Sequence, residues 1–192
     1  MPIAARQQQL QTIEDFDLFN DAQADDREFE LVEGEIVMMS NPTEAHEQIA
    51  GNIGARLKLA MDQRNCRTYQ GGMRVQRSDD RRETDRARPD VVVRCGAQSN
   101  KSFVTDPLVI VEVLSPSTID RDRGAKLDFY KSLPTVRHIA LIYQDQLRVE
   151  HYRRVEHGFE MEVLKGVGDE LRFEAIEFVL ALSRVYFGVE VE

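Results

Sequence analysis

The stretch Arg88-Pro89-Asp90-Val91-Val92-Val93, followed after a loop by Pro107-Leu108-Val109-Ile110-Val111-Glu112-Val113-Leu114, decides the fold of this chain. β-Branched residues fill both apolar runs and turn-forming residues bound them, which predicts two buried strands. Asp90 precedes the first run, and Glu112 lies inside the second. A charge in an apolar run costs free energy unless a partner compensates it. The pattern therefore predicts a shared cation or a hydrogen-bonding partner where the two strands meet.

The segments before this stretch predict two helices, a hairpin and a strand. Helices are expected over residues 10–21 and 41–63, the second with Asn41 as its cap and Pro42 as its first helical residue. Residues 29–39 predict a hairpin that turns at Gly34, and residues 66–76 predict a strand broken at Gly71-Gly72. A polar loop over residues 77–86 then leads to the Asp90 strand.

After the Glu112 strand, Ser117 or Thr118 is expected to cap a helix that ends near residue 133, and residues 136–143 predict a strand. Because that helix connects two neighbouring strands, the strands should be parallel. Short antiparallel strands are expected over residues 147–152, 159–164 and 169–173, and a last helix over residues 176–182.

The fold class that follows is α/β (α+β), a mixed sheet with flanking helices. Its core order is helix-strand-strand-strand-helix-strand. We expect one domain over residues 1–192, with an N-terminal helix and hairpin at 10–40, a core at 41–145, and antiparallel strands with a helix at 146–192.

Composition favours one globular domain, because 192 residues with 42% hydrophobic and 31% charged side chains suffice for a single core. No apolar stretch approaches the ~20 residues of a membrane helix. The first residues lack the apolar core of a signal peptide. Cys66 and Cys95 are too few for a disulfide framework. These features predict a reduced, cytoplasmic protein with inert thiols and no membrane partner.

The net charge of −9 argues against indiscriminate binding to nucleic acid. Between residues 64 and 88, however, eight arginines face only four carboxylates. Arg74, Arg77, Arg81 and Arg82 are therefore candidate phosphate contacts, although a solvated polar hairpin explains the same pattern. His151 and His157 are expected at the surface of the late strands.

The two central carboxylates suit a divalent cation if their strands are neighbours. Mg²⁺ binds through one or two protein carboxylates and keeps several waters, so a phosphate oxygen can join it. Asp90 and Glu112 are the candidate ligands, and the backbone carbonyl of Val113 is a further one. The simpler interpretation is a strand-end aspartate and a salt-bridged glutamate.

Asp122, Lys126 and Tyr130 follow one another at steps of four residues, which places them on one face of the predicted helix. They form an ordinary ion pair with a packed tyrosine, or they serve the site. Because the helix follows the Glu112 strand after a few residues, Lys126 lies within reach of a phosphate bound there.

Several pieces together resemble the bacterial Uma-type "putative restriction endonucleases" of the PD-(D/E)XK nuclease superfamily. The pieces are residues 29–36, 42–46, 88–93 and 110–118, with Asp122, Lys126 and Tyr130, and the resemblance spans about residues 29–143. It implies a DNA endonuclease that uses Mg²⁺ or Mn²⁺ held by Asp90 and Glu112. His46 and Glu33 match family positions as well.

Two positions depart from the pattern that the resemblance implies. Leu114 stands where the superfamily has a strand lysine, and the resemblance implies Lys126 in its place. The run Arg137-His138-Ile139-Ala140-Leu141 lacks the tryptophan usual in the family, which concerns packing or a substrate contact.

The function expected from the sequence is hydrolysis of DNA phosphodiester bonds by a Mg²⁺-dependent endonuclease. Two alternatives remain open: a DNA-binding or regulatory protein on the same fold with little or no cleavage, and a metal-dependent hydrolase of small phosphoesters. Cutting both strands of a duplex is simplest for a homodimer, and the strands after Leu147 are the expected interface.

Overall fold

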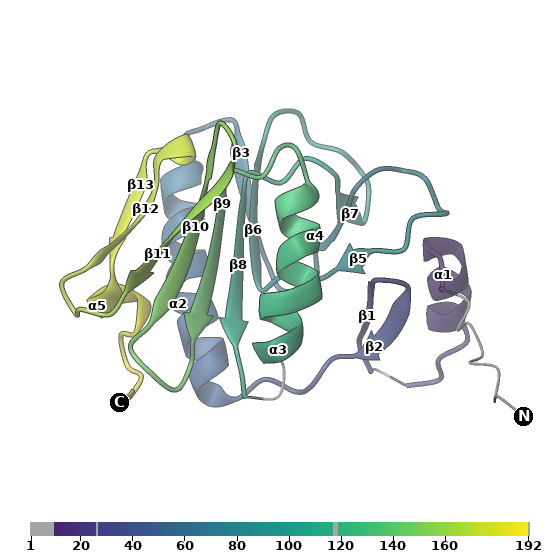
Figure 1. The fold of residues 1–192 in the computed structure, drawn as a ribbon, viewed down its shortest axis with the longest axis horizontal. Coiled ribbons are helices and arrows are strands. Elements are labelled where there is room, and N and C mark those ends of the chain that lie inside the picture. The colour runs from purple at the N-terminus through teal and green to yellow at the C-terminus, as the bar shows by residue number, and fades with distance from the viewer. Residues whose placement is uncertain (1–9, 26, 117–118, 192) are drawn as a thin grey trace, which may run out of the picture.

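The computed structural model describes residues 10–25, 27–116 and 119–191 of the chain. A six-stranded mixed sheet lies between helices, and a smaller sheet with helix α1 lies at one side of it (Figure 1). The expected caps Ser117 and Thr118 lie outside the described residues.

The main sheet has the order β11-β10-β9-β8-β6-β3. Its β8 and β9 are parallel, and its other neighbouring pairs are antiparallel. The helix between β8 and β9 makes the crossover that the sequence predicted, so the core order is confirmed. The strands are β3 (Cys66–Gln70), β6 (Val91–Cys95), β8 (Val109–Leu114), β9 (His138–Tyr143), β10 (Val149–Val155) and β11 (Gly158–Leu164).

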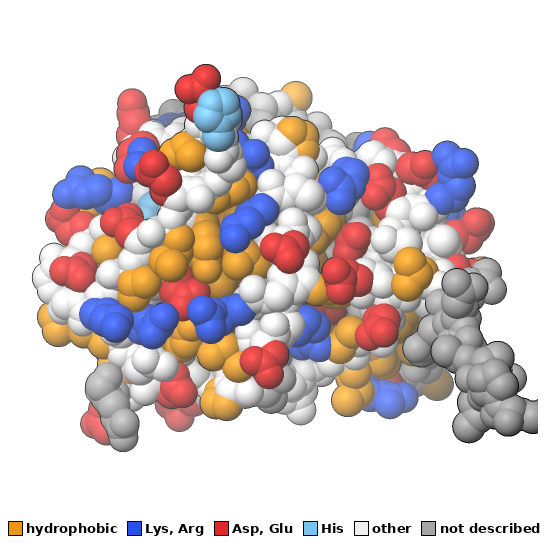
Figure 2. All heavy atoms as spheres, in the orientation of Figure 1, with side chains coloured by type: hydrophobic (Ala, Val, Ile, Leu, Met, Phe, Trp, Pro, Cys, Tyr) orange, Lys and Arg blue, Asp and Glu red, His pale blue; other side chains and the backbone are white. Residues whose placement is uncertain are grey.

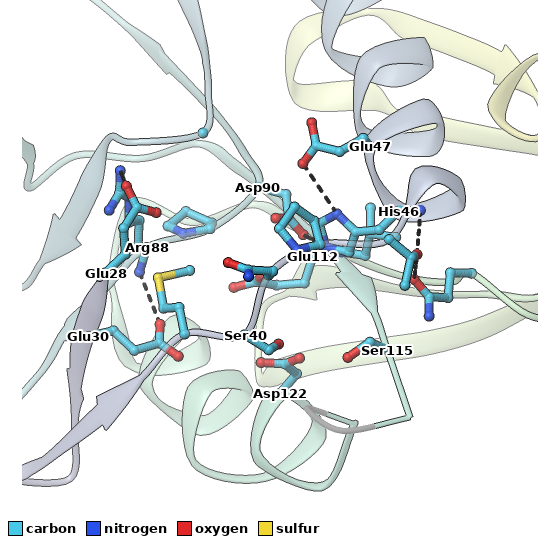
Figure 3. A pocket seen from close by; sticks show the side chains of 18 of the residues that line it. Glu28, Glu30, Ser40, His46, Glu47, Arg88, Asp90, Glu112, Ser115 and Asp122 are labelled. Atoms are coloured by element: carbon cyan, nitrogen blue, oxygen red, sulfur yellow. Dashed lines mark hydrogen bonds and ion pairs between the residues drawn. The ribbon is translucent and has the colours of Figure 1, made fainter. Parts of the chain in front are cut away.

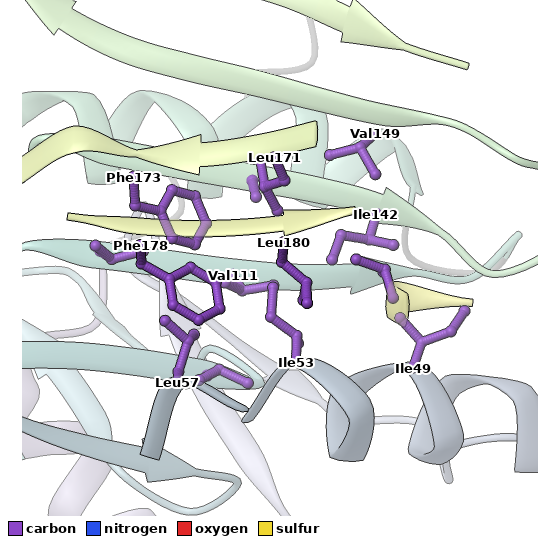
Figure 4. Close-up of a cluster of buried hydrophobic side chains, with 14 of the residues drawn as sticks. Ile49, Ile53, Leu57, Val111, Ile142, Val149, Leu171, Phe173, Phe178 and Leu180 are labelled. Carbon is purple, nitrogen blue, oxygen red and sulfur yellow. The ribbon is translucent and has the colours of Figure 1, made fainter. Parts of the chain in front are cut away.

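One face of this sheet is covered by helix α2 (Glu44–Met61) and by the hairpin of β12 (Glu170–Phe173) and β13 (Phe178–Ala181). Alternation along β8 sends Val111 to this face, where it joins Ile53 of α2 in a buried cluster (Figure 4). A 3-10 turn η2 (Glu174–Ile176) and a short helix α5 (Leu182–Val185) flank β13.

The helix expected over residues 176–182 was wrong, because most of this segment is strand β13. Phe178 and Leu180 are buried and Val179 between them is 47% exposed. This two-residue alternation is that of a strand with one buried face.

The opposite face of the sheet is covered by one helical segment. It consists of α3 (Ile119–Arg121), a π-helical turn η1 (Asp122–Lys126) and α4 (Leu127–Ser132). Ile110 and Leu114 of β8 pack on this side with Tyr130 of α4. Within η1, Gly124 has the non-helical angles φ −100° and ψ −110°.

The smaller sheet has the order β2-β1-β5-β4-β7, and α1 (Ile13–Asp21) packs on it through Ile13 and Phe16. The predicted hairpin is confirmed, and Glu33 (φ 49°) with Gly34 (φ 74°) forms its two-residue turn. The strand predicted over residues 66–76 divides at Gly71-Gly72 between the two sheets. The strands are β1 (Phe29–Val32), β2 (Glu35–Met38), β4 (Arg74–Gln76), β5 (Arg86–Ala87) and β7 (Phe103–Val104).

Helix α2 begins later than the sequence predicted. Thr43, instead of Asn41, is its N-cap, and the Thr43 hydroxyl accepts a hydrogen bond from the His46 N–H at 3.2 Å. This bond satisfies one of the N–H groups that the first helical turn leaves without a partner. It also fixes the position of His46 on the first turn.

Cys66 and Cys95 form a disulfide, which corrects the expectation of two inert thiols. The two residues are paired directly across β3 and β6, so their side chains lie on the same face of the sheet. Among the described residues, no helix is long and apolar enough to cross a membrane.

His138 and His151 lie beneath the β12–β13 hairpin, and both are buried. The expectation that His151 lies at the surface was therefore wrong, whereas His157 is exposed. The backbone N–H of Ala175 donates to Nε2 of His138 at 3.2 Å, so the proton of His138 is on Nδ1. That N–H faces Nε2 of His151 at 3.1 Å, and Nδ1 of His151 in turn faces a carboxylate oxygen of Glu162 at 2.8 Å.

Candidate functional site

A cavity of ≈ 340 Å³ lies where the main sheet, the start of α2 and the smaller sheet meet. Asp90, Glu112 and Lys126 line it, together with His46 and Asp122. Figure 3 shows Asp90 and Glu112 beside His46, with Glu30 and Asp122 around the same space. The structure thus brings together side chains from four separate stretches of the sequence.

The register of the sheet explains how the two carboxylates meet. Val91 of β6 is paired with Val111 of antiparallel β8. Asp90 directly precedes Val91 and Glu112 directly follows Val111, so the carboxylates occupy neighbouring positions at one end of the two strands.

Asp90 is oriented by two partners. Its Oδ2 accepts a hydrogen bond from the Val113 N–H at 2.6 Å and lies 3.3 Å from Nε2 of His46. Burial acts to lower the pKa of His46, but the hydrogen bond to Asp90 and its charge, with the charges of Glu47 and Asp122, outweigh burial and raise that pKa. His46 therefore favours its charged form next to Asp90.

Glu112 is buried and is held through one oxygen. Its Oε1 accepts a hydrogen bond from the Tyr130 hydroxyl at 2.5 Å and lies 2.7 Å from Nζ of Lys126. Burial raises the pKa of Glu112 well above its usual range; Lys126 opposes this, and the negative charges of Asp90, Asp122 and Glu30 add to it. The lining of the cavity holds six carboxylates and three permanent cations, so negative charge is in surplus there.

Lys126 directs its ammonium group into this cluster. Nζ lies 3.3 Å from Asp122 and 3.3 Å from Glu30, in addition to its contact with Glu112. Burial acts to lower the pKa of Lys126, but the charges of Glu112, Tyr130, Glu30 and Asp122 outweigh it and raise the pKa well above the usual range. The ion pair with Asp122 exists, but it is buried in the cavity wall instead of solvated on the helix surface.

Glu30 is the member of the site that the sequence reasoning missed. It lies on β1, is 1% exposed, and contacts both Lys126 and Nε of Arg121, the latter at 3.4 Å. Glu33, which the resemblance indicated, lies instead at the exposed hairpin turn, where its N–H donates to Asp85 at 2.8 Å. The signal for Glu30 was present, since it is a charge inside the apolar run Phe29-Glu30-Leu31-Val32, as Glu112 is in its own run.

The donor set of the cavity suits a hard divalent cation. Asp90 and Glu112 line it, and their shortest contacts with described residues fall on Oδ2 and Oε1, respectively. Within the described residues, no group of three or more His, Cys, Asp and Glu side chains is placed to hold a metal ion. Mg²⁺ does not need such a group, because it keeps several waters when it binds two carboxylates.

Val113 and Leu114, which follow Glu112 on β8, differ in their relation to the site. The N–H of Val113 orients Asp90, and the role of its carbonyl as a ligand stays a prediction. Leu114 is packed in the apolar cluster beneath α4, so the strand position of the lysine is occupied by a core residue.

The four candidate phosphate contacts lie apart from the residues that line the cavity. Arg74 stacks on the ring of Phe16, with Cζ 5.6 Å from the ring centroid. The other three contact carboxylates: Arg77 with Glu83 at 3.2 Å, Arg81 with Asp17 at 3.5 Å and Arg82 with Asp80 at 2.8 Å. This local pairing agrees with the solvated-hairpin interpretation, and phosphate binding there stays a prediction.

Two curated proteins match most of the chain in sequence. The chain is 26% identical over 162 residues to the uncharacterized protein slr1290 of Synechocystis, covering 83% of this chain and 84% of that protein. It is 28% identical over 149 residues to sll1609 of the same organism, covering 75% and 82%.

A crystal structure of a "putative nuclease belonging to DUF820" from Anabaena variabilis superposes with a TM-score of 0.70 at 17% identity, covering 91% of this chain and 97% of that one. The likeness shows a shared, restriction-endonuclease-like fold. The model of the Uma2 family, described as "Putative restriction endonuclease", matches residues 13–183. The chain, matched by this model over most of its length, belongs to the Uma2 family.

Proposed function

We propose that the protein is an endonuclease that hydrolyses phosphodiester bonds of DNA with Mg²⁺ or Mn²⁺ in the Asp90–Glu112 cavity. The observation that carries the proposal is the pairing of these two carboxylates across neighbouring strands, in a cavity lined by six carboxylates and three permanent cations. Membership of the Uma2 family supports a nuclease.

Asp90 and Glu112 would hold the metal, and their partners fix their orientation. The Val113 N–H and His46 hold one oxygen of Asp90, while Tyr130 and Lys126 hold one oxygen of Glu112. When bound, the cation would polarise the scissile phosphate and lower the pKa of the attacking water.

Lys126 places a fixed positive charge in the wall of the cavity. Negative charge develops on the phosphate oxygens as the phosphodiester reacts, and a charge that is already in position stabilises it without reorganisation. Glu30 and Asp122 hold Nζ of Lys126 at that place.

The test is a cleavage assay on supercoiled and linear DNA, with Mg²⁺ or Mn²⁺ against a chelator. We expect metal-dependent nicking or linearisation that Asp90→Asn abolishes, with unfolding curves confirming that the variant is folded. An absence of cleavage under every metal condition, together with DNA binding, would identify a nuclease-fold binding protein instead. Cleavage of a small phosphodiester but not of DNA would identify a metal-dependent hydrolase of small phosphoesters.

A further inference from the structure

The face of the main sheet beside α4 carries three aromatic rings that the proposed site does not use. Tyr143 of β9, Tyr152 of β10 and Phe159 of β11 lie on this face as part of, or packed against, the cluster beneath α4. Figure 2 shows an apolar patch in this region with Lys and Arg side chains gathered around it. Met161 and Val163, 52% and 37% exposed on β11, extend its apolar surface.

Each of the three rings carries a cation on its face. Nζ of Lys131 lies 4.4 Å from the ring centroid of Tyr152, Cζ of Arg154 lies 4.4 Å from that of Phe159, and Cζ of Arg148 lies 5.0 Å from that of Tyr143. A ring holds a cation in place without neutralising its charge. The charge of Lys131 therefore remains available to a ligand at the surface, whereas Arg148 also pairs with Glu150.

A buried carboxylate fixes the end of this row nearest the cavity. Glu150 is 0% exposed and accepts hydrogen bonds from Arg148 at 2.8 Å and from Arg123 at 3.2 Å, while the hydroxyls of Tyr143 and Tyr152 also donate to it. The Arg123 side chain is still 47% exposed. One carboxylate thus orders two guanidinium groups.

Charge on this face contrasts with the charge of the chain. Four cations (Arg123, Lys131, Arg148 and Arg154) gather there with the carboxylates of Glu150 and Asp128, in a protein with a net charge of −9. The arginines of the 77–82 loop, by comparison, each contact a carboxylate, and Arg81 shares Asp17 with Arg86.

The face and the cavity lie on the same side of the main sheet, because Glu150 is paired with Leu141 and Leu141 with Glu112. Arg123 follows Asp122, and Tyr143 precedes Gln144; both Asp122 and Gln144 line the cavity. A chain of phosphates bound along the face would therefore lead to Asp90 and Glu112.

We infer that this basic–aromatic face, with Arg123, Lys131 and Arg148 as its contacts, binds the phosphate backbone of the nucleic acid whose scissile bond enters the cavity. The inference rests on the proposed function for the identity of its ligand. Nucleic acid fits better than an acidic protein, because a row of cations beside a phosphodiester site matches a regularly charged polymer. Arg154 has a structural part, since it donates to the carbonyls of Lys131, Leu133 and Val136.

The test measures DNA binding without metal, so that it does not depend on cleavage. A fluorescent 30-base-pair duplex and the matching single strand are titrated with the protein in chelator at several salt concentrations. The double variant Arg123→Gln/Lys131→Gln is compared with Arg153→Gln/Arg172→Gln, which removes the same charge from two exposed arginines outside this face. We expect the first variant to reduce the log–log salt slope by roughly 1.8, at about 0.9 for each lost contact, and the second to leave it unchanged.

Charge-conserving Arg123→Lys/Lys131→Arg should keep the wild-type slope, which separates charge from local packing. An equal decrease of the salt slope in both Gln variants would mean a general charge effect. An unchanged slope in Arg123→Gln/Lys131→Gln would mean that these residues do not contact DNA. Either result overturns the inference. If polyglutamate displaces the fluorescent duplex from the protein as readily as unlabelled DNA does, the face would bind an acidic protein, and the inference would be overturned too. Failure of cleavage with this binding pattern intact would contradict the proposed catalysis alone.

Discussion

At the residue scale, Glu30 joins the hairpin of the smaller sheet to the cavity of the main sheet. Its carboxylate lies 3.3 Å from Nζ of Lys126 and 3.4 Å from Arg121. We expect Glu30→Gln to leave Lys126 less firmly held and to lower metal-dependent cleavage by about tenfold or more, since a small displacement of a positioned group is costly. A cleavage time course on supercoiled DNA measures this.

Glu33→Gln is the matched control, because Glu33 is three residues away in the same hairpin but exposed at its turn. It should cleave at the wild-type rate. The opposite ranking of the two variants would restore Glu33 as the functional residue and remove Glu30.

Lys126 is the side chain whose loss should matter most for both activity and stability. Lys126→Ala removes the cation near Glu112, so cleavage should fall by ~10²-fold or more. It also leaves three carboxylates buried without their common partner, so unfolding in urea should show a loss of about 3–5 kcal/mol. Loss of a surface ion pair would cost only a few tenths of a kcal/mol.

Asp122→Asn serves as the comparison for Lys126→Ala, because it removes one contact and keeps the cation. We expect intermediate stability and measurable cleavage from it. Full activity of folded Lys126→Ala would exclude the assigned role, whatever its stability.

The sequence predicted Asp90, Glu112, Lys126 and Tyr130 because their signals are local. A charge in an apolar run and a four-residue step on a helix are visible without knowledge of the fold. Glu30, and not Glu33, reaches the cavity because of the way the hairpin packs on the main sheet. This packing is a tertiary contact, and the sequence of the hairpin alone does not predict it.

At the element scale, segments with enough apolar positions to show a period were predicted correctly, and the shortest strands were not. Helix α2 and strands β6, β8 and β9 carry enough apolar positions to reveal their period. Strands β5 and β7 have two residues each, so no period exists to be found. Their pairing with β4, which completes the smaller sheet, is set by tertiary packing.

The β12–β13 hairpin is joined to the main sheet by His138, and this predicts a pH effect. Burial and the charge of His151 lower the pKa of His138 from 6.5 to about 4, with Glu174 opposing. Because the pKa is lower in the folded state, the unfolded chain takes up the proton first. The contribution to stability is complete above pH 6.5 and is lost between pH 6.5 and about pH 4.

Urea unfolding across this pH range measures the effect, and we expect a loss on the order of 1 kcal/mol after solvent screening. His138→Gln should remove this part of the pH dependence, whereas His157→Gln, at an exposed position, should retain it. An identical pH dependence in His138→Gln and the wild type would assign the effect to other groups.

At the scale of the whole molecule, the main sheet ends in the edge strand β11, which pairs with β10 on one side only among the described strands. β11 is seven residues long and lies at the edge of the sheet, with Met161 exposed on it. Such an edge offers free backbone groups and apolar surface to another strand. A two-fold axis perpendicular to the sheet would place the same face of both copies on one side, so both cavities would address one duplex.

We therefore predict a homodimer through the edge strand β11, because two sites related by a two-fold axis are the simplest way to cut both strands of a duplex. Light scattering on a size-exclusion column should give twice the 22.1 kDa mass of the chain. Met161→Lys should shift it to the monomer, because a charge on an edge strand opposes pairing. Leu59→Lys, at a position 72% exposed on α2, is the control that should remain dimeric. In the monomeric variant each cavity is intact, so nicking of supercoiled DNA should persist while linearisation falls. A wild-type monomer at every accessible concentration would remove the dimer and leave the chemistry of Asp90 and Glu112 unchanged.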